Sequence, residues 1–216
     1  MKAPRTTDDL LDQLAEVGRM AVGSGLALAS GGNLSARLPG SSEFVVTGAG
    51  TWLDRLTPAD FTVMSLDGEV LGGAVQEGVA RPSSEWKLHQ RTYRVRPDVN
   101  AVVHLHPQHA VLVDALGHRI RLITLDHAYY VRSVGTVPYF PNGSDELADG
   151  AAEQARDHDC VVLSHHGCSA LGADIGMAYR RALNLEEAAT ATYRCLAVGD
   201  TVTEFPADAF ADLHHA

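Results

Sequence analysis

The sequence predicts an α/β fold of the α+β type, with a helix near each end of the chain and antiparallel strands between them. Apolar residues recur at helical spacing over residues 8–21 and again over residues 174–193. Between these stretches, short apolar runs alternate with turns rich in Gly, Pro and Ser. Residues 61–66 and 69–71 are joined by Asp67-Gly68, which is typical of a β-hairpin and therefore of antiparallel pairing.

The composition fits one ordinary domain. The chain has 216 residues and a mass of 23.0 kDa, a size at which folding buries roughly 70% of the surface that the unfolded chain exposes. Hydrophobic residues make up 45% and charged residues 20%, which excludes a disordered chain and a disulfide scaffold. No repeat or linker interrupts the sequence, so we expect a single domain over residues 1–216.

The first helix is expected after Thr7, its predicted N-cap. Its apolar face consists of Leu10, Leu11, Leu14, Val17 and Ala21. Glycines end this helix, and residues 31–35, Gly-Gly-Asn-Leu-Ser, are interpreted as a turn-rich loop. A strand over residues 44–47 then runs into Gly48-Ala49-Gly50.

A second helix is predicted after Pro82, capped by Ser83 or Ser84 and ending before Pro97. Trp86, His89 and Tyr93 are spaced along one of its faces. Two short apolar strands follow, residues 101–106 and 161–166, and both end on histidines.

Charge and cysteine content restrict the compartment and the partners. The net charge of −10 argues against non-specific nucleic-acid binding, which needs clustered Lys and Arg. The three cysteines are odd in number and lack paired spacing, so we expect reduced thiols. The first residues contain no apolar h-region after the basic residues, and no stretch approaches 18 apolar residues, so we expect a cytoplasmic protein that does not span a membrane.

The histidines at the two strand ends suggest a metal site. Residues two apart in a strand point to the same face, so His104 and His106 would project side by side. His166, from the second strand, would complete three neutral nitrogen ligands with an open position, as in catalytic zinc sites. His165 is the weaker candidate because adjacent strand residues face opposite sides. Glu85, at the start of the preceding helix, would supply a carboxylate.

Three segments rich in small donors could hold an anion: residues 31–35, residues 47–50 and residues 82–85. Taken singly, each is more often a tight turn or a helix cap. A single phosphate held by such donors is compatible with an acidic chain, because backbone N–H groups can bind it without a local excess of positive charge.

In this order and spacing, these residues resemble the class II aldolase and adducin family over about residues 8–195. The resemblance lies in Gly-Gly-Asn-Leu-Ser at 31–35, Thr47-Gly48, Pro82-Ser83-Ser84-Glu85, residues 93–97 followed by the 101–107 strand with its His-Leu-His-Pro end, and His165-His166-Gly167 before the final helix. It implies a central, mainly antiparallel sheet flanked by helices, and commonly a C4 tetramer with active sites between neighbouring subunits.

The resemblance also implies roles for individual residues. The metal ligands are His104, His106 and His166, and the acid/base residue is Glu85. The phosphate cradle consists of Asn33, Thr47, Gly48, Ser83 and Ser84. Fuculose-phosphate aldolases carry an acid tyrosine after the histidine strand, supplied across the subunit interface. Residues 126–130 offer Tyr129 and Tyr130 as candidates, with His127 beside them.

The implied reaction is retro-aldol cleavage of a ketose phosphate to dihydroxyacetone phosphate and an aldehyde, together with the reverse aldol addition. A divalent metal, zinc first among Zn²⁺, Co²⁺, Mn²⁺ and Fe²⁺, would polarise the carbonyl and stabilise the enediolate. A lysine imine has little support, since Lys2 and Lys87 are the only lysines. The epimerase branch usually has aspartate where this chain has Glu85, which favours an aldolase.

Four alternatives use the same fold: a sugar-phosphate 4-epimerase, a thiosugar-phosphate dehydratase, a decarboxylase or metal-dependent oxygenase, and a non-catalytic adducin-like binding module. The retained histidines and carboxylate argue against the last of these.

Overall fold

An eight-stranded sheet forms the centre of the protein. The structure, a computed structural model, describes residues 3–73 and 81–213, and its strands follow the order β4-β3-β2-β1-β5-β8-β7-β6. Every pairing is antiparallel except that of β6 with β7. The strands are β1 (Asn33–Ala36), β2 (Glu43–Thr47), β3 (Phe61–Ser65), β4 (Val70–Gly73), β5 (Ala101–Leu105), β6 (Val134–Val137), β7 (Cys160–Leu163) and β8 (Gly167–Gly172). The mainly antiparallel sheet and the hairpin formed by β3 and β4 are therefore confirmed.

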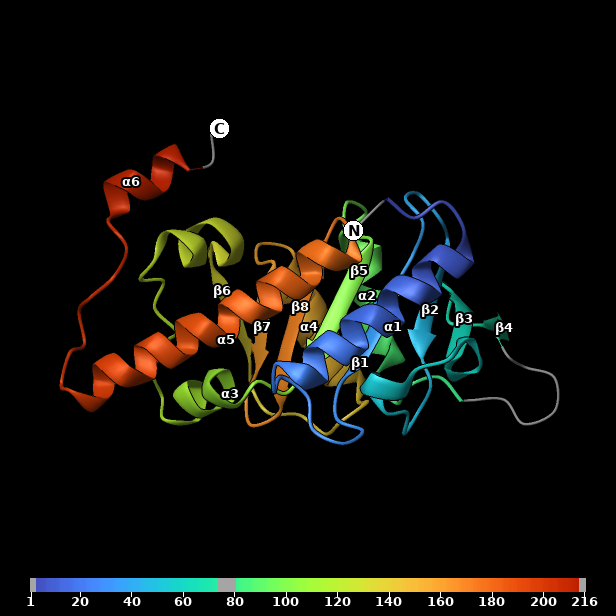
Figure 1. The fold of residues 1–216 in the computed structure, drawn as a ribbon, viewed down its shortest axis with the longest axis horizontal. Coiled ribbons are helices and arrows are strands. Elements are labelled where there is room, and N and C mark those ends of the chain that lie inside the picture. The colour runs from blue at the N-terminus through green and yellow to red at the C-terminus, as the bar shows by residue number, and fades with distance from the viewer. Residues whose placement is uncertain (1–2, 74–80, 214–216) are drawn as a thin grey trace.

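Helices cover both faces of this sheet (Figure 1). One face carries α1 (Thr7–Gly23) and α5 (Ile175–Ala197), and the other carries α2 (Trp86–Val95) and α4 (Asp145–Ala155). A shorter helix, α3 (Gln108–Ala115), and a π-helical turn, η3 (His127–Val131), pack near α5. The remaining elements are η1 (Leu53–Arg55), η2 (Pro58–Asp60) and α6 (Ala207–Asp212). No helix in the described residues has the length and apolar character needed to cross a membrane.

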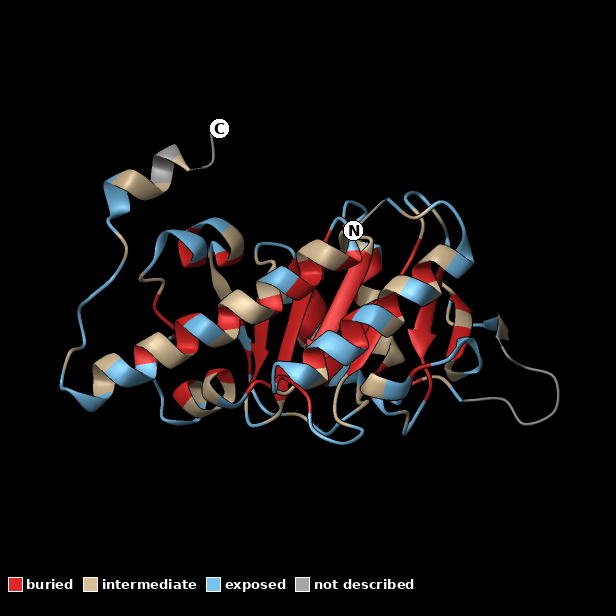
Figure 2. Cartoon of the chain, viewed as in Figure 1, coloured by how far each residue is buried: buried red, intermediate tan, exposed pale blue. Residues whose placement is uncertain are grey.

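Strand alternation divides the core between the two helical layers, and the central strands of the sheet between them are buried (Figure 2). Val103 and Leu105 of β5 pack in the cluster that contains α1 and α5. Val102 packs in the cluster that contains α2 and α4. His104 has the same parity as Val102, so its side chain belongs to the α2 face of the sheet. This placement brings the histidine strand towards Glu85, which directly precedes α2.

Three local predictions are wrong in detail. The N-cap of α1 is Thr6, whose hydroxyl accepts a hydrogen bond from the N–H of Asp9, and not Thr7. Asn33 and Ser35 belong to a strand because β1 pairs with both β2 and β5, and this pairing overrides the turn preference of the segment. Glu85 is the N-cap of α2, without a side-chain capping bond, in place of Ser83 or Ser84.

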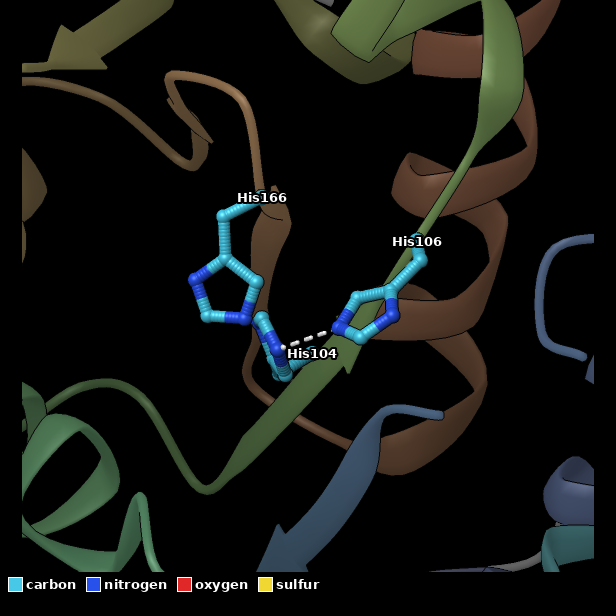
Figure 3. Close-up of side chains that lie close together, drawn as sticks. All are labelled: His104, His106 and His166. Atoms are coloured by element: carbon cyan, nitrogen blue, oxygen red, sulfur yellow. Dashed lines mark hydrogen bonds between the residues drawn. The ribbon is translucent and has the colours of Figure 1, made fainter. Parts of the chain in front are cut away.

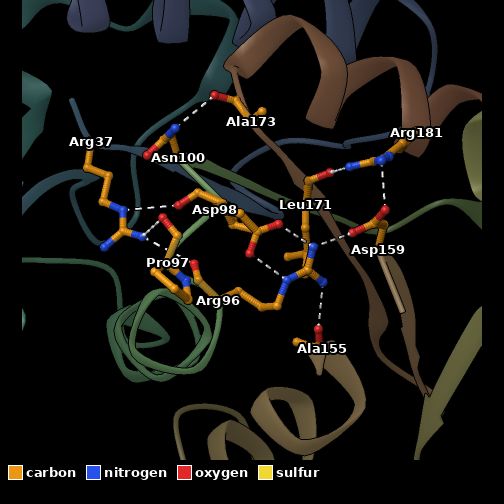
Figure 4. Close-up of polar contacts among 11 residues, drawn as sticks. Arg37, Arg96, Pro97, Asp98, Asn100, Ala155, Asp159, Leu171, Ala173 and Arg181 are labelled. Atoms are coloured by element: carbon orange, nitrogen blue, oxygen red, sulfur yellow. Dashed lines mark hydrogen bonds and ion pairs between the residues drawn. The ribbon is translucent and has the colours of Figure 1, made fainter. Parts of the chain in front are cut away.

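A polar network joins the segments at the start of β5, the end opposite the histidines (Figure 4). Arg96 forms ion pairs with Asp98 and Asp159, and Arg181 pairs with Asp159 at 2.7 Å between Nη2 and Oδ2. Arg181 also donates to the carbonyls of Leu171 and Tyr130. These contacts link the end of α2, the residue before β7, β8 and α5.

Candidate metal centre

Two of the three predicted ligands come from β5 (Figure 3). His104 lies in the strand and is fully buried, and His106 follows one residue beyond its end. The N–H of His106 donates to the carbonyl of Leu26, which holds the chain in place after the strand ends. The two Nε2 atoms lie 3.1 Å apart, as strand alternation predicts for side chains on one face.

His166 reaches the same place from the turn between β7 and β8. The prediction that it ends a strand is wrong, because β7 stops at Leu163 and the N–H of His166 closes a turn onto the Leu163 carbonyl. His165 occupies the left-handed region with φ of 58° and is exposed. The turn, and not strand alternation, therefore explains why His166 and not His165 faces the other histidines.

The three imidazoles surround a common point. Their ring centroids are 5.0, 4.9 and 5.1 Å apart, and each ring is steeply tilted against the others. One nitrogen from each ring falls within a set whose members all lie within 4.8 Å of one another. Two nitrogens bound to one zinc ion at about 2.1 Å with tetrahedral angles would lie roughly 3.4 Å apart. The 3.1 Å spacing of the His104 and His106 Nε2 atoms is close to that value.

The protonation of these side chains also fits a metal. Burial, reinforced by His104 and His166, lowers the pKa of His106 to about 4. Burial likewise lowers the pKa of His166. Both rings are therefore neutral near pH 7, which is the form that binds metal ions. A set of three imidazoles suits Zn²⁺ and other divalent transition metals.

Glycines allow the backbone to approach the histidines closely. A Cβ on Gly167 would lie 2.4 Å from the Leu105 carbonyl oxygen and 2.7 Å from Cδ2 of His106. A Cβ on Gly32, which has φ of +84°, would lie 2.7 Å from the His104 carbonyl oxygen. The glycines at 31–32, interpreted from sequence as part of a donor loop, therefore also serve close packing against the end of β5.

The carboxylate of Glu85 lies beside the imidazoles and is only 4% exposed. Its Oε2 is 3.0 Å from His104 Nε2 and its Oε1 is 3.4 Å from His166 Nε2. Burial by itself would raise the pKa of Glu85, but His104, His166 and a hydrogen bond from Asn33 outweigh it and hold that pKa below its ordinary range. A carboxylate at this distance can either ligate a metal or exchange a proton with a molecule bound next to it.

The segments predicted to hold a phosphate lie next to one another beside Glu85. The N–H of Ser83 donates to the Thr47 carbonyl, and Gly48 forms an antiparallel bridge with Pro82. The Thr47 hydroxyl accepts from the N–H of Leu34, which connects this pair of segments to β1. The Ser83 hydroxyl accepts from the N–H of Glu85, and Ser84 is exposed. Both buried hydroxyls, on Thr47 and Ser83, keep a proton to donate.

Asn33 makes a contact that the sequence did not suggest. Its Nδ2 donates to Glu85 Oε2 at 2.9 Å, and its Oδ1 lies 2.5 Å from Nε2 of His89. His89 and Tyr93, both buried, were not identified from sequence as part of the site, and Ser35 was named only within the 31–35 donor segment. The sequence does show that His89 and Tyr93 lie on one face of the predicted helix. Two polar residues on a helix face that packs into the core would have indicated a buried polar contact.

The structure does not bring the tyrosine candidates to the histidines of the same chain. Tyr129 and Tyr130 lie on η3, where their rings contact each other with centroids 5.0 Å apart. Among the described residues, neither ring forms a hydrogen bond or ring contact with the three histidines. His127 is fully buried, with Nδ1 accepting from the N–H of Ile123 and Nε2 paired with Glu187, so it stabilises its own turn.

Comparison with known proteins agrees with this geometry. The family model for the class II aldolase and adducin N-terminal domain matches residues 12–193. The chain belongs to the class II aldolase and adducin family. Among the relatives of this aldolase, the 5-deoxy-D-ribulose 1-phosphate aldolase of Bacillus thuringiensis is 31% identical over 189 residues, 88% of this chain and 86% of the relative. The L-fuculose phosphate aldolase of Methanococcus maripaludis is 32% identical over 183 residues, 85% of this chain and 96% of the relative.

The fold of this class II aldolase is also found in solved structures. The crystal structure of YgbL from Klebsiella pneumoniae superposes with a TM-score of 0.87 at 27% identity, covering 97% of this chain and 100% of that one. The family match, the aldolase relatives and the three-histidine cluster together show that the chain is an enzyme of the class II aldolase kind.

Proposed function

We propose that the enzyme cleaves a ketose phosphate by a metal-dependent retro-aldol reaction, yielding dihydroxyacetone phosphate and an aldehyde. The observation that carries the proposal is the buried carboxylate of Glu85 beside three imidazoles, 3.0 Å from His104 and 3.4 Å from His166. Reversible cleavage of a carbon–carbon bond next to a carbonyl needs an electrophile and a proton-transfer group side by side. Glu85 would be the proton-transfer group, and a metal ion held by the three imidazoles would be the electrophile.

The substrate class follows from the relatives and from the cradle. The two relatives act, by their names, on a deoxyribulose 1-phosphate and on fuculose phosphate. The adjoining Thr47, Gly48 and Ser83 would hold the phosphate through hydroxyl and backbone donors, with Asn33 and Ser84 at its border. This arrangement anchors the substrate next to Glu85, so that the reacting carbon lies within reach of the carboxylate.

His104, His106 and His166 would hold the divalent metal, with zinc as the proposed ion. When bound, it would act as a Lewis acid that polarises the substrate carbonyl and stabilises the negative charge that develops on its oxygen. Glu85 gives a proton to C3 when the C3–C4 bond of a 1-phosphorylated ketose breaks, and removes the same proton in the addition direction. The electron pair of the broken bond passes into the polarised carbonyl group.

The proton on the C4 hydroxyl must also leave, because that carbon becomes the aldehyde. We assign this transfer to Tyr129 or Tyr130 of a neighbouring subunit, in a homo-oligomer that we propose to be a tetramer. The exposure of Tyr129, at 44%, supports a role outside its own subunit. A cytoplasmic location is proposed as well, since free Cys160 and Cys168 are compatible with a reducing compartment.

The decisive variant is Glu85→Gln, which keeps the size of the side chain and removes the base. We expect kcat for dihydroxyacetone phosphate release from a 1-phosphorylated ketose to fall by roughly 10²–10⁴, with metal content and Tm unchanged. Near-native kcat in this variant would assign the proton transfer to another group. Release of the free aldehyde distinguishes an aldolase from an epimerase, which would return only a rearranged pentose phosphate.

A further inference from the structure

A row of buried side chains leads from Glu85 into the core between β1 and α2. Asn33 Nδ2 lies 2.9 Å from Glu85 Oε2, and Asn33 Oδ1 lies 2.5 Å from His89 Nε2. His89 Nδ1 lies 2.6 Å from the Ser35 hydroxyl, which lies 2.6 Å from the hydroxyl of Tyr93. Each of these five residues is at most 5% exposed. The row is therefore shielded from water along its whole length.

Two regular spacings produce this row. Glu85, His89 and Tyr93 are four residues apart and follow one face of α2 and its N-cap. Asn33 and Ser35 are two residues apart and share one face of β1. The helix face and the strand face meet, so that the strand residues alternate with the helix residues along the row.

The chemistry of the groups gives the hydrogen bonds a single direction. An ionised carboxylate only accepts, so the end of Asn33 that touches Glu85 is its NH₂ group and the other end is its carbonyl oxygen. His89 Nε2 must therefore donate to Asn33, and a neutral ring with its proton on Nε2 accepts at Nδ1. Ser35 then donates to His89 and accepts from Tyr93.

The protonation states agree with this direction. Burial lowers the pKa of His89 to about 3, so the ring is neutral at physiological pH. Burial also raises the pKa of Tyr93, which therefore keeps the proton that it donates to Ser35.

The consequence falls on Glu85. Its Oε2 is engaged by Asn33, whereas its Oε1 is buried without a hydrogen-bond partner among the described residues and points to the His166 side of the site. Asn33 and His104 thus both contact Oε2, and Oε1 is turned towards His166. We propose that His89 is a positioning residue, which holds Asn33 and through it the Glu85 carboxylate in the orientation that proton transfer requires. This inference rests on the proposed role of Glu85.

The test compares two substitutions of His89 in two backgrounds. His89→Leu removes the donor to Asn33, whereas His89→Gln places an amide NH₂ at nearly the same distance along the side chain. We expect His89→Leu to lower kcat roughly 10- to 100-fold with KM and metal content unchanged, as for other residues that orient groups of a metal site. His89→Gln should recover most of this loss, and His89→Leu should cause no further loss in Glu85→Gln.

A matched control on the same helix is Thr92→Val, which removes a buried hydroxyl that donates within α2 to the Leu88 carbonyl. Its kcat should equal that of the native enzyme. Equal losses from His89→Leu in the native and Glu85→Gln backgrounds would show a general structural role and overturn the proposal. A rise in KM for the phosphorylated substrate with unchanged kcat would assign the row to phosphate binding and overturn it as well.

A second measurement needs no turnover. Histidine ¹⁵N spectra of the zinc-loaded native enzyme at neutral pH should show His89 neutral with its proton on Nε2. A proton on Nδ1, or on both nitrogens, would overturn the proposal even if His89→Leu fails to fold. Failure of the proposed function has a different signature: the native enzyme would release no dihydroxyacetone phosphate, although the His89 tautomer is as stated.

Discussion

Gly167→Ala is expected to damage the metal site without touching any ligand. Gly167 begins β8 directly after His166, and a Cβ on it would lie 2.7 Å from Cδ2 of His106 and 3.3 Å from Cε1 of His104. The added Cβ would lie 2.4 Å from the Leu105 carbonyl oxygen, whereas real Cβ atoms keep at least 3.0 Å from such neighbours. The two strands must therefore separate by about 0.6 Å, the difference between these two distances. Leu105 lies between His104 and His106, so this movement displaces both ligands.

The expected magnitude has two parts. Overpacking at a tight site costs about 1–3 kcal/mol of unfolding free energy. Displacement of residues that orient metal ligands costs roughly 10- to 100-fold in metal affinity. Competition with a chromogenic chelator measures the Zn²⁺ affinity, and thermal unfolding of the metal-free protein measures the stability.

Gly172→Ala is the matched control for this prediction. It lies at the other end of β8, where a Cβ would approach Ala178 N and Asp174 O to 2.5 Å, and it is remote from the histidines. We expect a similar loss of stability and a native Zn²⁺ affinity. The reasoning would be refuted if Gly167→Ala lowered stability as much as Gly172→Ala but bound Zn²⁺ as tightly as the native chain.

Three further predictions concern pH, the phosphate and stability. The unfolded chain protonates His89 below about pH 6.5 but the folded chain only near pH 3, so unfolding free energy should fall with decreasing pH by about 1.4 kcal/mol per unit in that interval. For metal-free His89→Gln, unfolding free energies measured in urea should depend less steeply on pH in this interval. The same pH dependence as in the native protein would contradict the prediction. Ser83→Ala with Ser84→Ala should raise KM for a phosphorylated substrate far more than for its unphosphorylated analogue, and equal effects would remove both serines from the cradle. Arg181→Met should lower the free energy of unfolding in denaturant by roughly 3 kcal/mol. Its control, Arg156→Ala, breaks an exposed pair with Glu153 and should lower it by under about 1 kcal/mol. Equal losses would show that the polar network around Arg181 does not stabilise the fold.

The long periodic segments were predictable from sequence because their packing follows local pattern. Residues 8–21 and 174–193 carry apolar side chains at helical spacing, and both became helices against one face of the sheet. The Asp67-Gly68 turn likewise specified its hairpin through backbone geometry alone. Pairing between distant segments was not predictable in this way. Residues 33–36 carry turn-forming residues and became a strand only because β2 and β5 lie on either side.

In the candidate site, too, local pattern was predictable from sequence and contacts between distant segments were not. His104 and His106 were predictable as a pair because strand alternation is a local rule. His166 does lie beside this pair, as predicted, but the local reason was wrong, since a turn with His165 in the left-handed region orients it. The link from Glu85 through Asn33 to His89 joins residues more than 50 positions apart in sequence, and only the tertiary structure places them in contact.

The central claim is that His104, His106 and His166 together hold the one divalent metal of the active site. Elemental analysis of the purified native chain, His106→Ala and His165→Ala tests it most directly, because His165 is a neighbouring histidine that is exposed and outside the cluster. We predict close to one metal ion per chain in the native protein and in His165→Ala, and loss of the metal in His106→Ala. Undiminished metal in His106→Ala would contradict the claim.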